Sequence, residues 1–251
     1  MLRGIATSAT GMEAQKLRNE VIADNLANAS TSGYKAYQLV HKVHSEKNIT
    51  NSTDGTQIGK ITYGSEVYNT AFDFSQGSLR QTGNPLDIAI SGKGFFPIQD
   101  TEGNISYTRN GHFNLDSTGF LITQNGEYVL DSGLSPVFIG IEGINNVTIL
   151  RTGNVMVNGD FNSTIQPLAF PKGAQILRKG HDSFVKGSVN VVMQKPIQVN
   201  LQQGFIEASN VSSVKAAADM VQIMRTYEAN QHAMKAQTET LGMLMHITDG
   251  I

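Results

Sequence analysis

The sequence contains no cysteine, which excludes disulfide bonds, thiolate metal sites and thiol nucleophiles. No apolar segment approaches the roughly 20 residues that a membrane-spanning helix needs. Near the N-terminus there is one early cation, Arg3, but no continuous apolar stretch and no small-residue cleavage site. We therefore expect no cleaved secretory signal, and any route out of the cytoplasm would be one without cleavage.

Charge is also scarce. Only 16% of the 251 residues are charged, the formal net charge is -2, and there is no basic run. A nucleic-acid partner is therefore not expected. With 39% hydrophobic residues, the chain is not of the highly charged, disordered type. Its length suits one large domain or two small ones.

The C-terminal segment from about Ser209 to Ile247 is predicted to form one long helix, capped by Ser209 or Asn210. Apolar residues recur in it at two heptad positions, which is a coiled-coil pattern. The first position holds Met220, Tyr227, Met234 and Leu241, and the second holds Ile223 and Leu244, with Asn230 and Gln237 between them. A helix this long at the end of a chain needs a partner.

The N-terminal segment, from residue 1 to about residue 29, is predicted to supply that partner. Ile5, Met12 and Leu26 keep the same seven-residue spacing. Gly11 lies inside this helix at a cost of ~1 kcal/mol relative to alanine, so packing must compensate. The alternative is that both are ordinary core helices of a globular domain. Their terminal positions, around a β-rich middle, favour a paired coiled coil.

The segment between the two helices divides into two parts by pattern. Residues 36–71 are predicted to be an extended linker and hairpin. Residues 72–202 show short strands with turns about every ten residues, typical of an antiparallel sandwich or barrel. We expect strands at 86–90, 95–98, 105–109, 112–115, 120–123, 127–130, 147–150, 154–157 and 165–170, with lower regularity over 173–200. The predicted class is α+β, with a helical assembly domain (1–35 and 203–251) and an inserted all-β domain.

No pattern of catalytic residues is found, and we predict no enzyme, metal or cofactor. The six histidines are scattered and are expected on the surface or in the linker. The run Gly92-Lys93-Gly94 precedes a strand, which contradicts a phosphate-binding loop, so a turn is expected. Asp87, Asp116 and Asp131 are expected to bond local backbone in turns. A cell-wall hydrolase using Asp87 or Asp116 stays a minor alternative.

Arg109 is the most specific-looking charge of the β region. It could be a solvated strand end. It could instead lock a turn, or meet a neighbouring subunit through its planar fork of donors. The sequence does not decide among these.

Three stretches together resemble one family. Residues 24–35, with Asn25, Leu26, Ala27 and Asn28 followed by Thr31, Gly33 and Tyr34, resemble the signature of bacterial flagellar rod and hook proteins; Ser32 stands where proline is frequent. Residues 86–96 and 107–116 are similar to the mid-chain block of that family, and residues 204–211 to its C-terminal block. Residues 131–200 carry no matching motif.

The resemblance implies a structural subunit of the flagellar basal-body rod, outside the cytoplasmic membrane. The length, and the roughly fifty residues between Gly33 and Asp87, favour the proximal-rod type (FlgF) slightly over the distal-rod type (FlgG). Family members leave through the flagellar type III export apparatus and polymerise helically with themselves and with other rod and hook subunits, where outer rings are possible neighbours. The alternative is a cell-wall or carbohydrate binding module on a helical stalk.

We expect the assembly contacts to involve the two helices and the three blocks that resemble the family. Asn25 and Asn28 are expected to close the first helix and bond a neighbour, and substituting Tyr227 by aspartate to abolish assembly. The expected contact residues are Ile5, Met12, Asn25, Leu26, Asn28, Tyr34, Arg109, Met220, Ile223, Tyr227, Met234, Leu241 and Leu244.

Overall fold

The computed structural model describes residues 2–43, 46–50, 56–62, 65–141, 146–188, 191–196 and 199–248. The chain divides into two compact units. Unit 1 comprises residues 1–27, 37–73 and 212–251, and unit 2 comprises residues 28–36 and 74–211. Each unit is therefore built from segments that lie far apart in the sequence.

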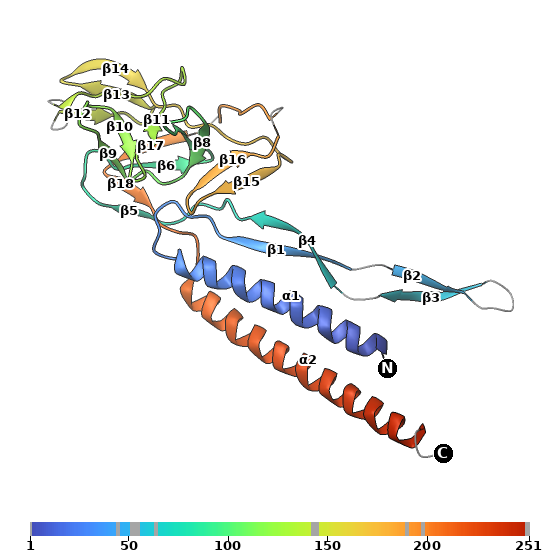
Figure 1. Ribbon diagram of the computed structural model, residues 1–251. Helices are drawn as coiled ribbons and strands as arrows, with labels where there is room; N and C mark the ends of the chain where they lie inside the picture. Colours follow the sequence, from blue (N-terminus) through green and yellow to red (C-terminus); the bar gives the residue numbers. More distant parts are fainter. Residues whose placement is uncertain are drawn as a thin grey trace. The chain divides into compact units, whose positions relative to one another are not determined.

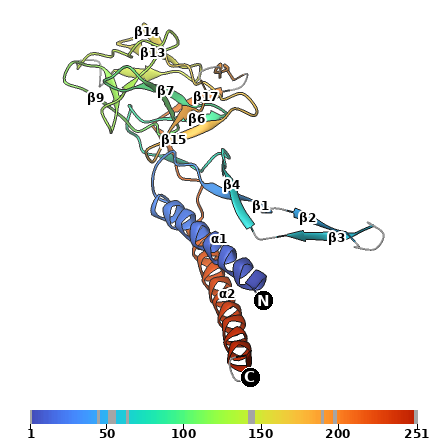
Figure 2. The ribbon, with the colours of Figure 1, turned by 45° about the vertical axis from the view of Figure 1, so that its right-hand side comes forward.

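The described part of unit 1 contains two helices and four strands. Helices α1 (Leu2–Ala27) and α2 (Ser213–Thr248) run antiparallel and side by side, as Figures 1 and 2 both show. Strand β1 (Tyr37–Val43) pairs antiparallel with β4 (Ser65–Phe72), and β2 (Glu46–Thr50) pairs antiparallel with β3 (Gln57–Thr62). Both terminal helices were predicted.

The start of α2 differs from the prediction. Neither Ser209 nor Asn210 caps it, because the Asn210 carboxamide accepts a hydrogen bond from the Ala36 backbone N–H (2.8 Å) and bonds the Ser75 carbonyl oxygen. The Ser212 hydroxyl accepts from the Lys215 N–H instead (3.4 Å), three residues on, as an N-cap does. The helix therefore begins at Ser213.

Unit 2 consists of short strands joined by turns. Their bounds are β5 (Leu79–Gln81), β6 (Ile88–Gly92), β7 (Phe96–Gln99), β8 (Ile105–Thr108), β9 (Phe113–Leu115), β10 (Leu121–Thr123), β11 (Tyr128–Val129), β12 (Val147–Ile149), β13 (Asn154–Val157), β14 (Asp160–Thr164), β15 (Ile176–Lys179), β16 (Ser183–Lys186), β17 (Val199–Gln203) and β18 (Phe205–Glu207).

All the strand pairs among these described residues are antiparallel, as predicted. A seven-stranded sheet has the order β15-β16-β8-β7-β11-β10-β9, and a smaller sheet has the order β12-β13-β14. Strand β6 pairs with β17, and β5 with β18, so the end of unit 2 returns to its beginning. The predicted α+β class is confirmed.

One hydrophobic core joins these sheets. Ile88 and Ile90 of β6, Phe96 and Ile98 of β7, and Leu201 of β17 are fully or almost fully buried in it. Phe96 and Phe113 meet edge to face in its centre, with ring centroids 5.2 Å apart. Alternate residues of β12, Val147 and Ile149, point into the same core, as period-two patterning requires.

Two strand assignments need correction. Residues 165–170 do not form a strand and make only isolated bridges, Phe95 with Leu168 and Ala169 with Gln194. Strand β14 was missed, because its polar residues show no alternation. It follows the two-residue turn Asn158-Gly159, in which both residues have positive φ (54° and 91°), as a type I′ hairpin needs.

Candidate assembly surfaces and a buried ion cluster

The face between α1 and α2 carries most of the predicted heptad residues. Ile223 is buried, and the predicted side chains Ile5, Met12, Leu26, Met220, Met234 and Leu241 are partly buried. Tyr227 is 41% exposed although it holds a heptad position. Leu244 lies outside the residues whose side chains are described. The burial follows the predicted period, and the assignment to contacts between subunits stays a prediction.

The polar heptad residues lie opposite glycines of α1. The Cα of Gly11 faces the Asn230 carboxamide, and that of Gly4 faces the Gln237 carboxamide, so closely that an added Cβ would come within 3.2 Å and 2.3 Å of them. Glycine thus makes room for a polar side chain in the seam. This close approach is the packing compensation that the presence of Gly11 required.

A second apolar stripe lies on α2 outside this seam. Val214, Val221 and Met224 are spaced by seven and three residues, so they share one helix face. Val214 is 80% exposed, and the other two are more than half exposed. In the described part of unit 1, nothing covers this stripe.

The most unusual feature of unit 2 is a buried cluster of three charges. Glu207 accepts a hydrogen bond from the Lys35 ammonium (2.6 Å) on one oxygen and from the Arg109 guanidinium (2.9 Å) on the other. The side chains of Lys35 and Glu207 are 0% exposed, and that of Arg109 is 3% exposed. We call these three residues the buried ion cluster.

Backbone groups complete the cluster. The Gly77 N–H donates to the carboxylate (2.8 Å), the Ser75 carbonyl oxygen accepts from Lys35 (2.6 Å), and Arg109 donates to the carbonyl oxygens of Ile90 and Gly92. The carbonyl dipoles balance the excess positive charge, since two cations share one carboxylate. Burial lowers the pKa of Arg109 below its usual range, and Glu207 opposes that shift.

The cluster decides the role of Arg109 that the sequence left open. A solvated strand end is wrong, because the guanidinium is buried over the Phe95 ring, 5.5 Å from its centroid. Arg109 locks the end of β6 and the turn after it, and its planar fork of donors is directed at its own chain. The structure therefore does not favour a direct contact between Arg109 and a neighbouring subunit.

The other predicted block residues also bond within the chain. In unit 1, the Asn25 carboxamide exchanges hydrogen bonds with the backbone of Tyr37, donating at 2.8 Å and accepting at 3.2 Å. In unit 2, Asn28 accepts from the Thr31 hydroxyl (3.2 Å) in the turn after α1. Tyr34 is fully buried and carries the Arg178 guanidinium over its ring, 4.4 Å from the centroid. The contacts of Asn25 and Asn28 lie at the end of α1 and in the turn after it, and their bonding to a neighbouring subunit stays a prediction.

Asp87 belongs to a second polar group. It is almost fully buried, and its carboxylate accepts from the Thr82 hydroxyl (2.5 Å) and bonds the His112 ring nitrogen Nδ1 (2.6 Å). The Asp87 carboxylate therefore bonds side chains, whereas the sequence suggested local backbone. Asp116 and Asp131 do bond the backbone of their own turns, as predicted. Among the described residues, no serine or threonine hydroxyl bonds the His112 ring, so no pair of nucleophile and histidine is formed there.

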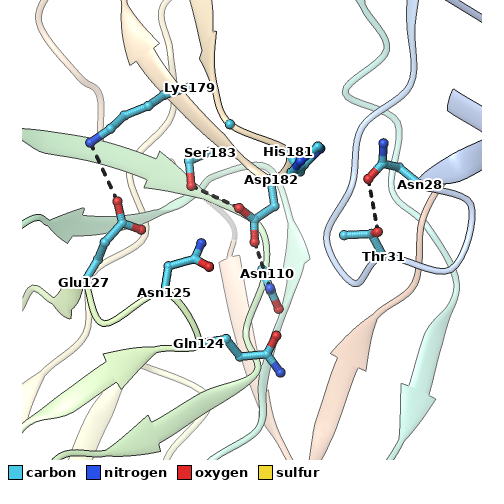
Figure 3. Close-up of a pocket in the computed structure, with 11 residues that line it drawn as sticks. Asn28, Thr31, Asn110, Gln124, Asn125, Glu127, Lys179, His181, Asp182 and Ser183 are labelled. Carbon is cyan, nitrogen blue, oxygen red and sulfur yellow. Dashed lines mark hydrogen bonds and ion pairs between the residues drawn. The ribbon is translucent and has the colours of Figure 1, made fainter. Parts of the chain in front are cut away.

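A polar pocket of about 560 Å³ opens on unit 2 (Figure 3). Lys179 reaches across it to Glu127 (3.7 Å) and also bonds Asp100 (3.0 Å). Asp182 accepts from the Asn110 carboxamide (2.8 Å). Burial raises the pKa of Glu127, which Lys179 opposes. The backbone N–H of Asn104 and then Lys179 lower the pKa of Asp100 from 3.8 to about 2.

The pocket offers hydrogen bonds and not acid–base chemistry of a recognisable kind. The carboxylates of Asp182 and Asp100 are held by internal partners, and Gln124 and Asn125 present exposed carboxamides at its mouth. Among the described residues, no group of histidines and carboxylates is arranged to hold a metal ion.

Comparison with known proteins agrees with the three sequence blocks. Residues 5–35 match the profile described as "Flagella basal body rod protein", residues 89–157 match "Flagellar hook protein FlgE/F/G D1 domain", and residues 202–247 match "Flagellar basal body rod FlgEFG protein C-terminal". The chain is 31% identical to a "Flagellar basal-body rod protein FlgG" of Buchnera aphidicola subsp. Schizaphis graminum, over 98% of this chain and 100% of that protein.

The chain belongs to the flagellar basal-body rod protein family. It is 32% identical to a rod protein FlgF of Caulobacter vibrioides, over 84% of this chain and 83% of that protein. It is also 29% identical to the hook-basal body complex protein FlhO of Bacillus subtilis, over 96% of each. Relatives named FlgF and FlgG thus match at the same level of identity, and the subtype is not separated.

Family membership makes this chain a structural subunit of the rod in the flagellar basal body. No helix in the described part of the chain is long and apolar enough to cross a membrane. Each residue of the buried ion cluster comes from a different matched region: Lys35 from the first, Arg109 from the second and Glu207 from the third. All three residues lie in the blocks that resemble the family, but the sequence does not connect Lys35 with Glu207, since only the fold brings them together.

Proposed function

We propose that the chain polymerises through α1 and α2, with copies of itself and with other rod and hook subunits, into the helical shaft that transmits torque from motor to hook. The observation that supports this most is the second apolar stripe of α2. Val214, Val221 and Met224 expose a continuous apolar face on a helix that already buries its first seam. A helix with two apolar faces can pack against two neighbours, so it suits a multi-helix wall better than an isolated pair.

The polar groups of the seam support the same proposal. Among the described residues, the buried oxygens of the Asn19 and Gln237 carboxamides have no hydrogen-bond partner. Such groups cost about 1–3 kcal/mol each when they stay unpaired. A helix pair with this deficit is marginal alone and gains from neighbours that complete it. The predicted coiled-coil seam, with Ile5, Met12, Met220, Met234 and Leu241, is the part of α1 and α2 that would hold the pair together meanwhile.

Marginal stability before assembly suits the predicted route of delivery. Export through the flagellar type III apparatus requires a chain that passes a narrow channel in a largely unfolded form. Helices that become fully stable only in the assembly would not resist this unfolding. Ring proteins around the rod are further candidate neighbours of unit 2. A catalytic role is not part of this proposal.

Amide hydrogen exchange on the purified chain and on isolated basal bodies tests the proposal. We expect α1 and α2 (residues 2–27 and 213–248) to exchange much faster than the core strands in the dilute monomer and to be protected in basal bodies. The core strands β6 and β7 are an internal control, because they should be protected in both samples. Terminal helices that are already protected in the dilute monomer would overturn the proposal.

Protected monomer helices would favour the binding module on a helical stalk. The pocket of Figure 3 is where such a module would hold a sugar, since the carboxamides of Gln124 and Asn125 can serve hydroxyl groups. Tight binding of peptidoglycan fragments by the purified chain, lost in Asn125→Ala, would support that alternative.

A further inference from the structure

An apolar groove of about 370 Å³ lies on unit 2, apart from the surfaces described above. The aromatic rings of Phe74, Phe95 and Phe170 line it. They hold one another edge to face, with ring centroids 5.4 Å apart for Phe74 and Phe95 and 5.3 Å apart for Phe95 and Phe170. The groove is therefore a firm apolar surface with a fixed shape.

The charges at this groove are all positive. Lys93 and Lys172 line it and are exposed, while Arg109, deeper in it, is already bound to Glu207. None of its described lining residues is acidic. An occupant with an aromatic side chain beside a carboxylate would satisfy both the apolar surface and the free cations.

The same unit presents such a pair of side chains. Phe161 is 63% exposed on β14, and it has no ring contact with another described aromatic residue. Asp160 precedes it and is exposed, without an ion pair among the described residues. The rigid Asn158-Gly159 turn directly before them fixes the strand, so little conformational freedom is lost when Phe161 is bound.

We propose that Phe161 of one copy inserts into the aromatic groove of the next copy, with Asp160 paired to Lys172. This deepens the proposed function and rests on it, since the occupant is a neighbouring copy. Figures 1 and 2 both place β14 away from β15, whose first residue Ile176 lines the groove. Donor and acceptor surfaces that differ make a head-to-tail contact, which propagates as an open helical polymer.

The polar pocket of Figure 3 does not suit the same occupant. Glu127 and Asp182 line that pocket and would repel Asp160. No phenylalanine, tyrosine or aliphatic residue is among its described lining, so it offers Phe161 no hydrophobic side chain to pack against. The charge of the hairpin therefore selects the aromatic groove.

The absence of native cysteine allows a clean test with the full chain in flagellated cells. Cells co-express Asn162→Cys and Lys172→Cys, basal bodies are isolated after mild oxidation, and disulfide-linked dimers are quantified on non-reducing gels. A matched pair, Ser117→Cys with Lys172→Cys, places the first thiol on an exposed turn elsewhere. We expect at least about tenfold more dimer from the first pair, because adjacent thiols meet at a millimolar effective concentration.

Equal dimer yields from both pairs, with all variants recovered in basal bodies, would overturn the docking of Phe161. That result would leave the proposed function standing, whereas absence of the wild-type chain from basal bodies would overturn the proposed function itself. Exchange of charges is a second test that needs no cysteine. Asp160→Lys and Lys172→Asp should each reduce swimming, and the two together in one chain should restore it. A double variant no better than the single variants also overturns the proposal.

Discussion

The Glu207 carboxylate lies 2.6 Å from the Lys35 ammonium, although 172 positions separate the two residues in the chain. Both side chains are fully buried, so each depends on the other for its charge balance. A buried ion pair is weak evidence for stability compared with an apolar replacement, but breaking one leaves an uncompensated charge in the interior.

We predict that Glu207→Gln lowers the free energy of unfolding by about 3–5 kcal/mol, because Lys35 and Arg109 then lose their counter-ion. Urea unfolding followed by circular dichroism measures this change. The matched control is Glu102→Gln, at an exposed turn, which should stay within about 0.5 kcal/mol of wild type. A loss below about 1 kcal/mol in Glu207→Gln would contradict the assigned role of the cluster.

Gly33 should tolerate no side chain. Its φ is +71°, and an added Cβ would lie 2.3 Å from the backbone nitrogen of Asn110. Gly83 has a similar φ of +77° but faces open space. We expect Gly83→Ala to cost about 1–2 kcal/mol from its left-handed conformation alone. Gly33→Ala should cost about 1–3 kcal/mol more, from overpacking against a backbone that cannot move aside. Equal unfolding midpoints for the two variants would refute the close approach.

Two neighbouring substitutions on α2 should separate folding from assembly. Val221→Asp introduces a charge on the exposed stripe, so the monomer should keep its helix content while incorporation into basal bodies is lost. Ile223→Asp buries the charge against α1 and should reduce both. Gln222→Asp, at an exposed polar position one residue further on and off the stripe, controls for the helix propensity of aspartate. Normal incorporation of Val221→Asp would sink the assignment of this stripe to assembly.

The link between Asp100 and Lys179 predicts a pH dependence. The pKa of Asp100 is lowered from 3.8 to about 2, so its ionised form is favoured by folding. Its stabilisation is therefore complete above the unfolded pKa and disappears as the pH falls from about 4 towards 2. The difference in unfolding midpoint between wild type and Asp100→Asn should be present at pH 7 and close to zero near pH 2. A difference that is constant across this range would argue against the lowered pKa.

Local patterns were sufficient to predict the elements, and their placement was not. The heptads of α2 and the short β segments separated by turns depend on residues close together in the sequence, so the helix and most strands were found. The start of α2 was wrong because Asn210 bonds Ala36, a residue that no local pattern connects with it. Residues 165–170 looked like a strand from their local pattern, although they make only isolated bridges, with Phe95 and with Gln194.

The buried ion cluster shows the same limit for function. A lysine, an arginine and a glutamate on three short blocks each look like surface residues, because charged side chains are mostly exposed. The pairing of β18 with β5, and the hydrogen bond from the Gly33 N–H to the Glu207 carbonyl oxygen (2.7 Å), bring Glu207 to the other two. Arg109 was singled out by its place at a strand end, but its partner could not be read from spacing. The exposed Phe161 hairpin was missed because the strand after its turn is mostly polar and shows no alternation, although the Asn158-Gly159 pair is itself a hairpin signal.

The order in which a ribosome makes this chain gives the buried ion cluster one more consequence. Lys35 and Arg109 are synthesised early, and both wait for a single carboxylate at position 207. Until that residue leaves the ribosome, closing unit 2 would bury two cations without an anion, which is strongly unfavourable. Strands β17 and β18, which pair with β6 and β5, arrive equally late. A nascent copy therefore cannot complete unit 2 until residue 207 has left the ribosome.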